Sequence, residues 1–432
     1  MVPKLFLLLQ KSHSGILSHE VIVSYFLRGS TLSLPSDSLP GATKATVMAI
    51  PRLNAQVCNL DLSGFNQLSD EVLASVITQL KFLRCLVLRN CSKASSKTVA
   101  AIVKSCPNIR SLNFNETSVG PDAIAELLVV HGGELEVLKL ANLPRWTDAT
   151  FMAQLHHRVK DEAVYMPKLR SLKLRGLQIS DSSIDFLLSL SPNLKRLDIS
   201  FTASRRPASF TMRRDLFSTS TTFSPPPLEK LSLTSTPVRE SDLLLTIPLF
   251  PALQTLSLGA LGYKGSIGSS AAATLNDATL QKLTVKLQSF SNLRSVSLVS
   301  NTRLGTLSKT ALFDFIQHIG RKCSYLNLAG ISSMRSNVLA ALLPLEDQAE
   351  EAPALETLVL NNTGVDDECG PYLACCSALV RLEVEGTKIT SQGLFPIIDA
   401  CTKLQVLNLT SCRGVPVSDR RRFFEVWQSQ QT

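Results

Sequence analysis

The chain has 432 residues, of which 44% are hydrophobic, and its formal net charge at neutral pH is +9. This length would fit roughly two or three globular domains, and the hydrophobic share is sufficient for a large buried core. No apolar run approaches the ~18 residues of a membrane-spanning helix, so we expect no membrane segment. The basic residues are not gathered into one run, which argues against a polybasic tail.

One short pattern recurs along almost the whole chain, in the form L-x-x-L-x-L-x-x-(N/C/T). In the copy from Leu83 to Cys91, Leu86 and Leu88 are two residues apart and leave the same face of a short strand. Steps near 26 residues with this spelling are typical of a leucine-rich repeat, whose period is ~20–29 residues. Thirteen copies begin at the anchor residues Val57, Leu83, Ile109, Leu135, Leu169, Leu194, Leu228, Leu253, Leu293, Cys323, Leu355, Leu379 and Leu404.

The second half of each repeat favours a helix. Polar residues such as Ser69 and Asp70 precede an apolar run, and they can accept hydrogen bonds from the free N–H groups of a first helical turn. Six repeats place a proline two residues before the anchor, which ends the helix. We therefore predict an α/β leucine-rich-repeat solenoid, a horseshoe of about thirteen repeats with a parallel concave sheet and helices on the convex side.

This spelling resembles the cysteine-containing leucine-rich repeats of ribonuclease-inhibitor-like proteins, best known from F-box substrate receptors. The residues that carry the resemblance are 86–91 and 407–412, each ending in Cys, and the step Leu-Ser-Asp at 68–70. The resemblance covers roughly residues 57–412. Several repeats depart from it and carry Thr in the Cys position, for example Thr117. The resemblance implies the solenoid fold and a role in recognising the substrate of a ubiquitin ligase.

The ten cysteines are placed like core residues. Cys106, Cys376 and Cys401 lie three residues before an anchor, and Cys91 and Cys412 close the strand motif. Buried free cysteine behaves as a small hydrophobic residue, so we expect reduced thiols and a reducing compartment. The apolar run near the N-terminus is shorter than the ~7–15 residues of a signal-peptide core. These features predict a cytoplasmic or nuclear protein.

The segments outside the repeats have more than one interpretation. Residues 1–56 are a helical cap on the open core or a degenerate adaptor-binding segment, and no convincing F-box begins there. Residues 413–432 are expected to form a C-terminal cap. Insertions near 144–168, 203–227, 262–290 and 344–353 should form surface loops. The loop at 203–227 is either a simple connection or a binding and kinase-target segment, and its candidate binding residues are Arg205, Arg206, Arg213 and Arg214.

We find no motif for catalysis. The six histidines are scattered without metal-ligand spacing, and there is no G-x-S-x-G, H-E-x-x-H or phosphate-binding loop. No C-x-x-C pair is present either, and the adjacent Cys375 and Cys376 are a poor arrangement for zinc. We therefore expect no enzyme activity, no cofactor and no metal.

The remaining candidate is the concave sheet. The residues at the third, fifth and seventh places of each copy should point away from the core. With parallel strands ~4.8 Å apart, basic residues at these places should form one patch that attracts an acidic or phosphorylated protein segment. The alternative is an ordinary solvated surface. The patch residues are Arg89, Lys139, Lys173, Arg175, Arg196 and Lys230.

Three functions remain open. The first is a non-catalytic protein-interaction scaffold, recognising substrates in a ubiquitin ligase with a cullin-ligase adaptor as a second partner. The second is a nuclear repeat protein associated with nucleic-acid repair, which the basic patch favours but the absence of aromatic stacking residues from the patch disfavours. The third is a regulator of one folded partner, in the manner of ribonuclease inhibitor.

Overall fold

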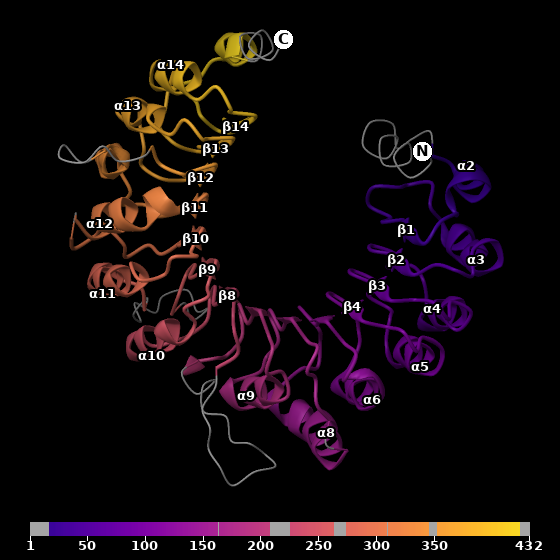
Figure 1. Cartoon of the computed structure of the whole chain (residues 1–432). Helices are drawn as coiled ribbons and strands as arrows, with labels where there is room; N and C mark the ends of the chain where they lie inside the picture. The colour runs from indigo at the N-terminus through magenta and orange to yellow at the C-terminus, as the bar shows by residue number, and fades with distance from the viewer. Residues whose placement is uncertain are drawn as a thin grey trace. The chain divides into compact units, whose positions relative to one another are not determined.

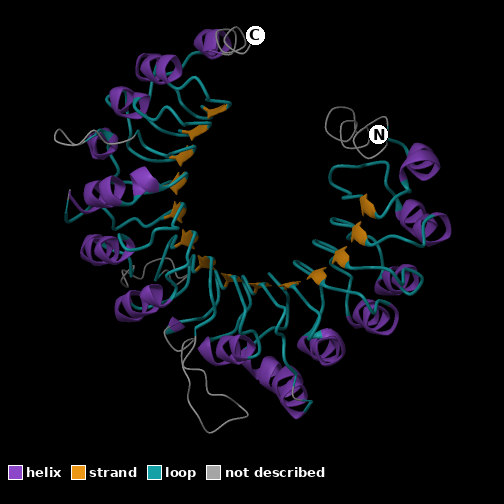
Figure 2. Ribbon diagram, viewed as in Figure 1, coloured by secondary structure: helices purple, strands orange, loops and turns teal. Residues whose placement is uncertain are grey.

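The structure is a computed structural model, and it describes residues 17–162, 164–207, 225–262, 274–308, 310–344 and 352–423. The chain divides into two compact units. The first unit comprises residues 1–204 and 212–227, and the second comprises residues 205–211 and 228–432. In each unit the strands lie on one side and the helices on the other (Figures 1 and 2).

The first unit is built on parallel strands that follow one another in chain order. Their bounds are β1 (Thr31–Ser33), β2 (Asn59–Asp61), β3 (Cys85–Val87), β4 (Ser111–Asn113), β5 (Val137–Lys139), β6 (Ser171–Lys173) and β7 (Arg196–Asp198). The α-helices are α2 (His19–Val21), α3 (Lys44–Leu53), α4 (Asp70–Ile77), α5 (Ser96–Ser105), α6 (Pro121–His131), α7 (Asp148–Thr150), α8 (His157–Asp161) and α9 (Asp181–Ser189). Two π-helical segments, η2 (Ile22–Phe26) and η3 (Phe151–His156), adjoin them.

The second unit repeats this plan. Its parallel strands are β8 (Lys230–Ser232), β9 (Thr255–Ser257), β10 (Ser295–Ser297), β11 (Tyr325–Asn327), β12 (Thr357–Val359), β13 (Arg381–Glu383) and β14 (Val406–Asn408). The α-helices are α10 (Glu240–Thr246), α11 (Asp277–Leu287), α12 (Thr310–His318), α13 (Cys369–Ala374) and α14 (Ser391–Ala400). Short 3₁₀ helices are η5 (Ile247–Leu249), η6 (Gly320–Lys322) and η7 (Ser336–Leu342). Each unit therefore has the architecture of a leucine-rich-repeat solenoid.

The thirteen predicted strands are all present, and each begins two residues after its anchor. The structure adds a fourteenth, β1, which pairs with β2 within the region expected to be a helical cap. Its central Leu32 and the following Leu34 are buried like their counterparts in other repeats. The sequence pattern missed this strand because Gly29 stands in place of the apolar anchor.

The core of each unit is a stack of apolar side chains that the strands point inward. Leu86 and Leu88 in the first unit, and Leu358 and Leu360 in the second, are completely buried. The burial decreases only at β14, the last strand, where Leu407 is half-buried. Contacts between neighbouring repeats therefore supply the core, as expected of a solenoid.

A turn with left-handed backbone follows each of the thirteen predicted strands, seven residues after the anchor. A positive φ favours Gly, and Asn tolerates it better than most residues. Most positions are Gly, Asn or Ser, but Glu116, Phe201 and Ala260 are exceptions. The residues with positive φ here are Gly64, Asn90, Glu116, Asn142, Gly176, Phe201, Ser235, Ala260, Ser300, Gly330, Asn362, Gly386 and Ser411.

The next position explains why the motif ends in Asn, Cys or Thr. Cys91 donates from Sγ to the carbonyl of Leu62 in the preceding repeat, at 3.0 Å. Thr117 instead donates from Oγ1 to the carbonyl of Phe114 in its own repeat, at 2.8 Å. Asn301 does both, with 2.8 Å from Nδ2 to each carbonyl oxygen. All three side chains are buried and satisfy carbonyl groups that the turn removes from water.

An aspartate at or just before the start of a helix connects one repeat to the next. Asp70 accepts hydrogen bonds from the backbone N–H groups of Ser95, Lys97 and Thr98, and from the hydroxyls of Ser95 and Thr98. Asp367 accepts in the same way from Thr390 and Gly393 in the second unit. The carboxylate thus satisfies the N–H groups that the first turn of the following helix leaves free.

All ten cysteines are free thiols in the structure. The expected burial is confirmed at Cys91, Cys106, Cys323, Cys376, Cys401 and Cys412. Burial raises the pKa of the Cys106 thiol to about 12 and has the same effect at Cys323. These thiols are core residues.

Candidate protein-binding site

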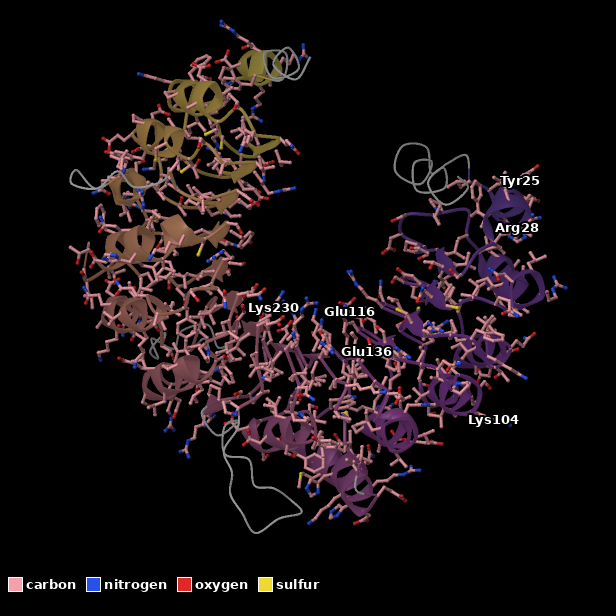
Figure 3. All side chains as sticks on the ribbon, in the orientation of Figure 1. Tyr25, Arg28, Lys104, Glu116, Glu136 and Lys230 are labelled. Atoms are coloured by element: carbon pink, nitrogen blue, oxygen red, sulfur yellow. The ribbon has the colours of Figure 1, made fainter. Side chains whose placement is uncertain are left out.

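The strands present two kinds of side chain. In most of them the central residue is buried and its two neighbours are half-buried or exposed, as in β6, where Leu172 lies between Ser171 and Lys173. The neighbours point to the strand side, away from the helices. Figure 3 shows these side chains at the inner edge of each unit, where Lys230 is labelled, whereas Lys104 extends from the helical side.

Four of the predicted cations are brought together on the strand side of the first unit. Lys139 on β5 and Lys173 on β6 are register partners. The pKa of the Lys173 ammonium is lowered, first because its partial burial disfavours the charged form. Nearby positive charges lower it further, and they belong to Arg175, Lys139 and Arg89. We call these four residues the cation cluster.

The acidic residues near this cluster are held by local contacts. Asp198 on β7 is the register partner of Lys173, and its Oδ2 lies 4.0 Å from Nζ of that lysine. Its other oxygen accepts a hydrogen bond of 3.1 Å from the backbone N–H of Ser200. Asp61 similarly accepts from the N–H and the hydroxyl of Ser63, at 2.9 and 2.6 Å. The acid in contact with the cluster is thus Asp198, which pairs with Lys173 and also accepts from the backbone of Ser200.

The other predicted binding residues are not members of the cluster. Arg196 is exposed at the start of β7, in register with Ser171 and beside the cation cluster. Lys230 is exposed on β8, which belongs to the second unit. The backbone carbonyl of Arg205 accepts a hydrogen bond from the N–H of Arg239, and both residues belong to the second unit. Arg206 is assigned to the second unit as well, and Arg213 and Arg214 lie outside the described residues.

One residue of the site was missed by the sequence argument. The guanidinium carbon of Arg175 lies 4.3 Å from the ring centroid of Phe201, which is a cation–π distance. The Phe201 side chain is 47% exposed. The statement that no aromatic side chain lies at the patch is therefore wrong. The only signal in the sequence was a large residue in a turn position that usually holds Gly, Asn or Ser.

The strand side of the second unit has a different character. Glu383 receives a hydrogen bond of 3.1 Å from Asn361 and pairs with Arg381 at 3.0 Å. Glu385 accepts from Nδ2 of Asn408 at 3.3 Å. Its acids are thus matched by neighbouring amides and by one arginine.

Two searches of the described residues concern other kinds of site. No group of three or more His, Cys, Asp or Glu side chains in this part of the chain is placed to hold a metal ion. Among the helices that the structure describes, none combines the length and the apolar character needed to cross a membrane.

Comparison with known proteins supports the fold. No family model matches the sequence, and no curated protein matches it. A chain of the yeast complex of Rad7 and Elc1 superposes with a TM-score of 0.56 at 17% identity, over 91% of this chain and 93% of that one. An internalin of Listeria monocytogenes gives 0.43 at 16% identity, over 85% and 94%. A leucine-rich-repeat protein of Leptospira interrogans gives 0.42 at 14%, over 95% and 96%.

The first of these likenesses, together with the strand order and the repeated motif, defines the class of the protein. It is a leucine-rich-repeat solenoid with parallel strands on one side and helices on the other. At 17% identity the likeness shows the fold alone. What the protein does must therefore be argued from the side chains on its strand side.

Proposed function

We propose that the protein is a non-catalytic interaction scaffold whose first unit binds an acidic or phosphorylated segment of a protein partner. The observation that carries this proposal is the cation cluster, in which Lys173 is partly buried beside three further cations and one carboxylate. Holding like charges together costs free energy, which an anionic ligand would recover. Arg89 and Arg175 can each grip a carboxylate or a phosphate with two parallel hydrogen bonds.

We also propose that the scaffold recognises substrates for a ubiquitin ligase in the cytoplasm or the nucleus. Two features support this context. The motif resembles the repeats of F-box receptors, and the yeast chain of similar fold was crystallised in a complex of two proteins, Rad7 and Elc1. The predicted adaptor segment includes residues 1–16, which lie outside the described residues. A variant lacking residues 1–16 retains β1 and α3, so it should fold but no longer co-purify with a cullin-ligase adaptor.

Charge reversal tests the binding surface. Lys173→Glu with Arg175→Glu should melt like the parent, because both side chains lie on the strand side, and should lose the main protein partner in affinity purification with mass spectrometry. Ser295→Glu with Ser297→Glu is the matched control, since it adds the same number of acids to the strand side of the second unit. If the Lys173/Arg175 variant retains every partner, the proposed binding surface is wrong.

The same purification separates the two alternatives. Partners that nuclease treatment releases from the bait would indicate nucleic-acid binding. The ring of Phe201 beside Arg175 is a favourable feature for that function. One stoichiometric folded partner, with no ligase components, would indicate a regulator like ribonuclease inhibitor.

A further inference from the structure

The backbone at Phe201 is unusual. Its φ is 60°, in the left-handed region, where a bulky side chain is a conformational outlier. Phe201 is the only aromatic residue among the described residues with positive φ. Strained residues of this kind persist where the surrounding structure fixes them, and they cluster at binding sites. The left-handed turn belongs to the repeat, and what calls for an explanation is a large aromatic side chain at this position.

The contacts of Phe201 supply one. The ring is 47% exposed although it is large and apolar. Its described aromatic contact is with the guanidinium of Arg175, a member of the cation cluster. The stacking limits the orientations of this guanidinium and leaves its N–H groups directed outward in the plane of the fork. An exposed apolar surface and an oriented cation thus lie side by side.

We propose that Phe201 and Arg175 form the specificity-determining pair of the binding surface, and that its occupant is an extended acidic peptide carrying one large apolar side chain. This inference rests on the proposed function. The apolar side chain of the ligand packs on the exposed part of the Phe201 ring, and a neighbouring carboxylate accepts hydrogen bonds from Arg175. Further carboxylates lie against the remaining members of the cation cluster.

The dimensions of the first unit fit such a ligand. The cluster and Arg196 extend from β3 to β7, which is four strand steps or about 19 Å at the usual strand separation. A fully extended peptide covers that distance with roughly six residues at ~3.3 Å each. Lys139, Lys173 and Arg196 lie on these strands, and Arg89 and Arg175 follow β3 and β6 by two residues. The acids on strands β2 to β7 are Asp61 and Asp198, and both are engaged locally. Charge complementarity therefore favours a short peptide with several acids.

A peptide fits these residues better than single-stranded nucleic acid does. Base stacking needs free aromatic faces along the groove, and the guanidinium of Arg175 already covers one face of the Phe201 ring. In β2 to β7, the strand residues that point to the strand side include no aromatic side chain. Hydrophobic anchoring of one peptide side chain needs only the exposed part of one ring.

The test uses immobilised arrays of octapeptides. Each peptide carries three glutamates and one position that is varied through all residue types, and the full-length protein is the soluble partner. The parent should prefer peptides with Leu, Ile, Met or Phe at the varied position by about tenfold over Ser, a typical effect of one anchor contact. Phe201→Ser should reduce this preference to less than about twofold while keeping the requirement for acids.

Phe82→Ser is the matched control, because Phe82 is 46% exposed in the same unit but lies in the turn before β3. This variant should keep the apolar preference of the parent. Thermal melting should show that neither variant is less stable than the parent by more than a few degrees. For Phe201→Ser this is expected because Ser235, Ser300 and Ser411 occupy the same left-handed turn position in other repeats.

Each other outcome has a definite meaning. A parent without apolar preference, or a Phe201→Ser variant that retains it, overturns the inference. In that case the proposed function stands as long as Lys173→Glu with Arg175→Glu abolishes binding to the acidic peptides. Binding that this double variant retains overturns both. A parent that ignores these peptides, and binds either phosphoserine versions or a labelled oligothymidine instead, also overturns the acidic-peptide occupant.

Discussion

The strand sides of the two units differ in how far their charged side chains are paired. In the first unit, Lys173 is partly buried among Arg175, Lys139 and Arg89, with Asp198 as its acidic neighbour at 4.0 Å. In the second unit the acids are matched by amides and by one arginine, as in the contact of 3.1 Å from Asn361 to Glu383. The first surface is left with unmatched positive charge, and the second is nearly satisfied by its own residues.

This difference separates what the repeat fixes from what it leaves free. Both units use the same buried leucines, the same left-handed turns and the same aspartate link between repeats. The half-buried strand positions differ between the units. The repeat therefore determines the fold but not the ligand. The few side chains at these strand positions set the specificity.

The largest expected effect concerns the part that the units share. Leu172 and Leu358 are the central residues of β6 and β12 and are 1% and 0% exposed. Leu172→Asp and Leu358→Asp should each bury an unpaired charge between stacked repeats and lower the free energy of unfolding by several kcal/mol. Urea denaturation followed by circular dichroism measures this loss. A normal unfolding curve for either variant would contradict the common core.

Most of this frame could be predicted from the sequence. The spacing of apolar anchors located thirteen strands, because a buried strand face forces a strict period of two. Strand β1 was missed because the pattern is recognised by an apolar anchor two residues before each strand, and Gly29 occupies that position. The roles of Asp70 and Thr117 were not predicted either. Their partners depend on how neighbouring repeats stack, which a one-dimensional pattern does not contain.

The placement of the candidate residues was predicted in part. Alternation along the strands correctly assigned Lys139, Lys173 and Arg175 to the same surface. The contribution of Phe201 depends on a left-handed backbone and on a cation–π contact across two repeats, and neither follows from periodicity. Lys230, which the same count assigned to the patch, stands on β8 of the second unit.

The link between repeats should be sensitive to acid. Burial of the Asp70 carboxyl acts to raise its pKa, but the hydrogen bonds from Ser95 and Thr98 together outweigh it, and the pKa is lowered from its ordinary value of 3.8. The folded state thus favours the ionised form. Asp70→Asn should lower the free energy of unfolding by about 1.5–3 kcal/mol at pH 7, the usual range for hydrogen bonds to a charged group.

The pH dependence of this loss tests whether it comes from the charge of Asp70. A lowered folded-state pKa contributes stability that is complete above the unfolded pKa and is lost as the pH falls through the folded pKa. The difference between the parent and Asp70→Asn should therefore be constant near neutrality and shrink below the ordinary carboxyl pKa. Urea titrations from pH 7 to pH 3 measure it. A difference that stays constant through this range would show that the charge of Asp70 is not what links the repeats.

A smaller effect should again be shared by both units. Thr117 and Thr363 are buried, and each donates a hydrogen bond to a carbonyl of its own turn, at 2.8 and 2.7 Å. Thr117→Val and Thr363→Val keep the shape but leave the carbonyl unsatisfied, so each should lose about 1 kcal/mol of stability. Chemical denaturation of the two variants side by side is the measurement. A loss in one unit alone would mean that the turns are not equivalent.

The smallest effect should distinguish the units most sharply. Lys139→Gln removes one cation from the cluster, and a single solvent-screened ion pair is worth only ~0–1 kcal/mol, so affinity for an acidic octapeptide should fall by less than about fivefold. Arg381→Gln removes a cation from the second unit, where the charge is already matched by Glu383, and should leave the affinity unchanged. Fluorescence anisotropy at increasing salt measures both. The loss at Lys139 should disappear as the Debye length falls from about 8 Å at 0.15 M to about 3 Å at 1 M. Equal losses in the two variants would mean that the peptide senses the net charge of the whole chain, and the contrast between the two strand sides would then have no part in recognition.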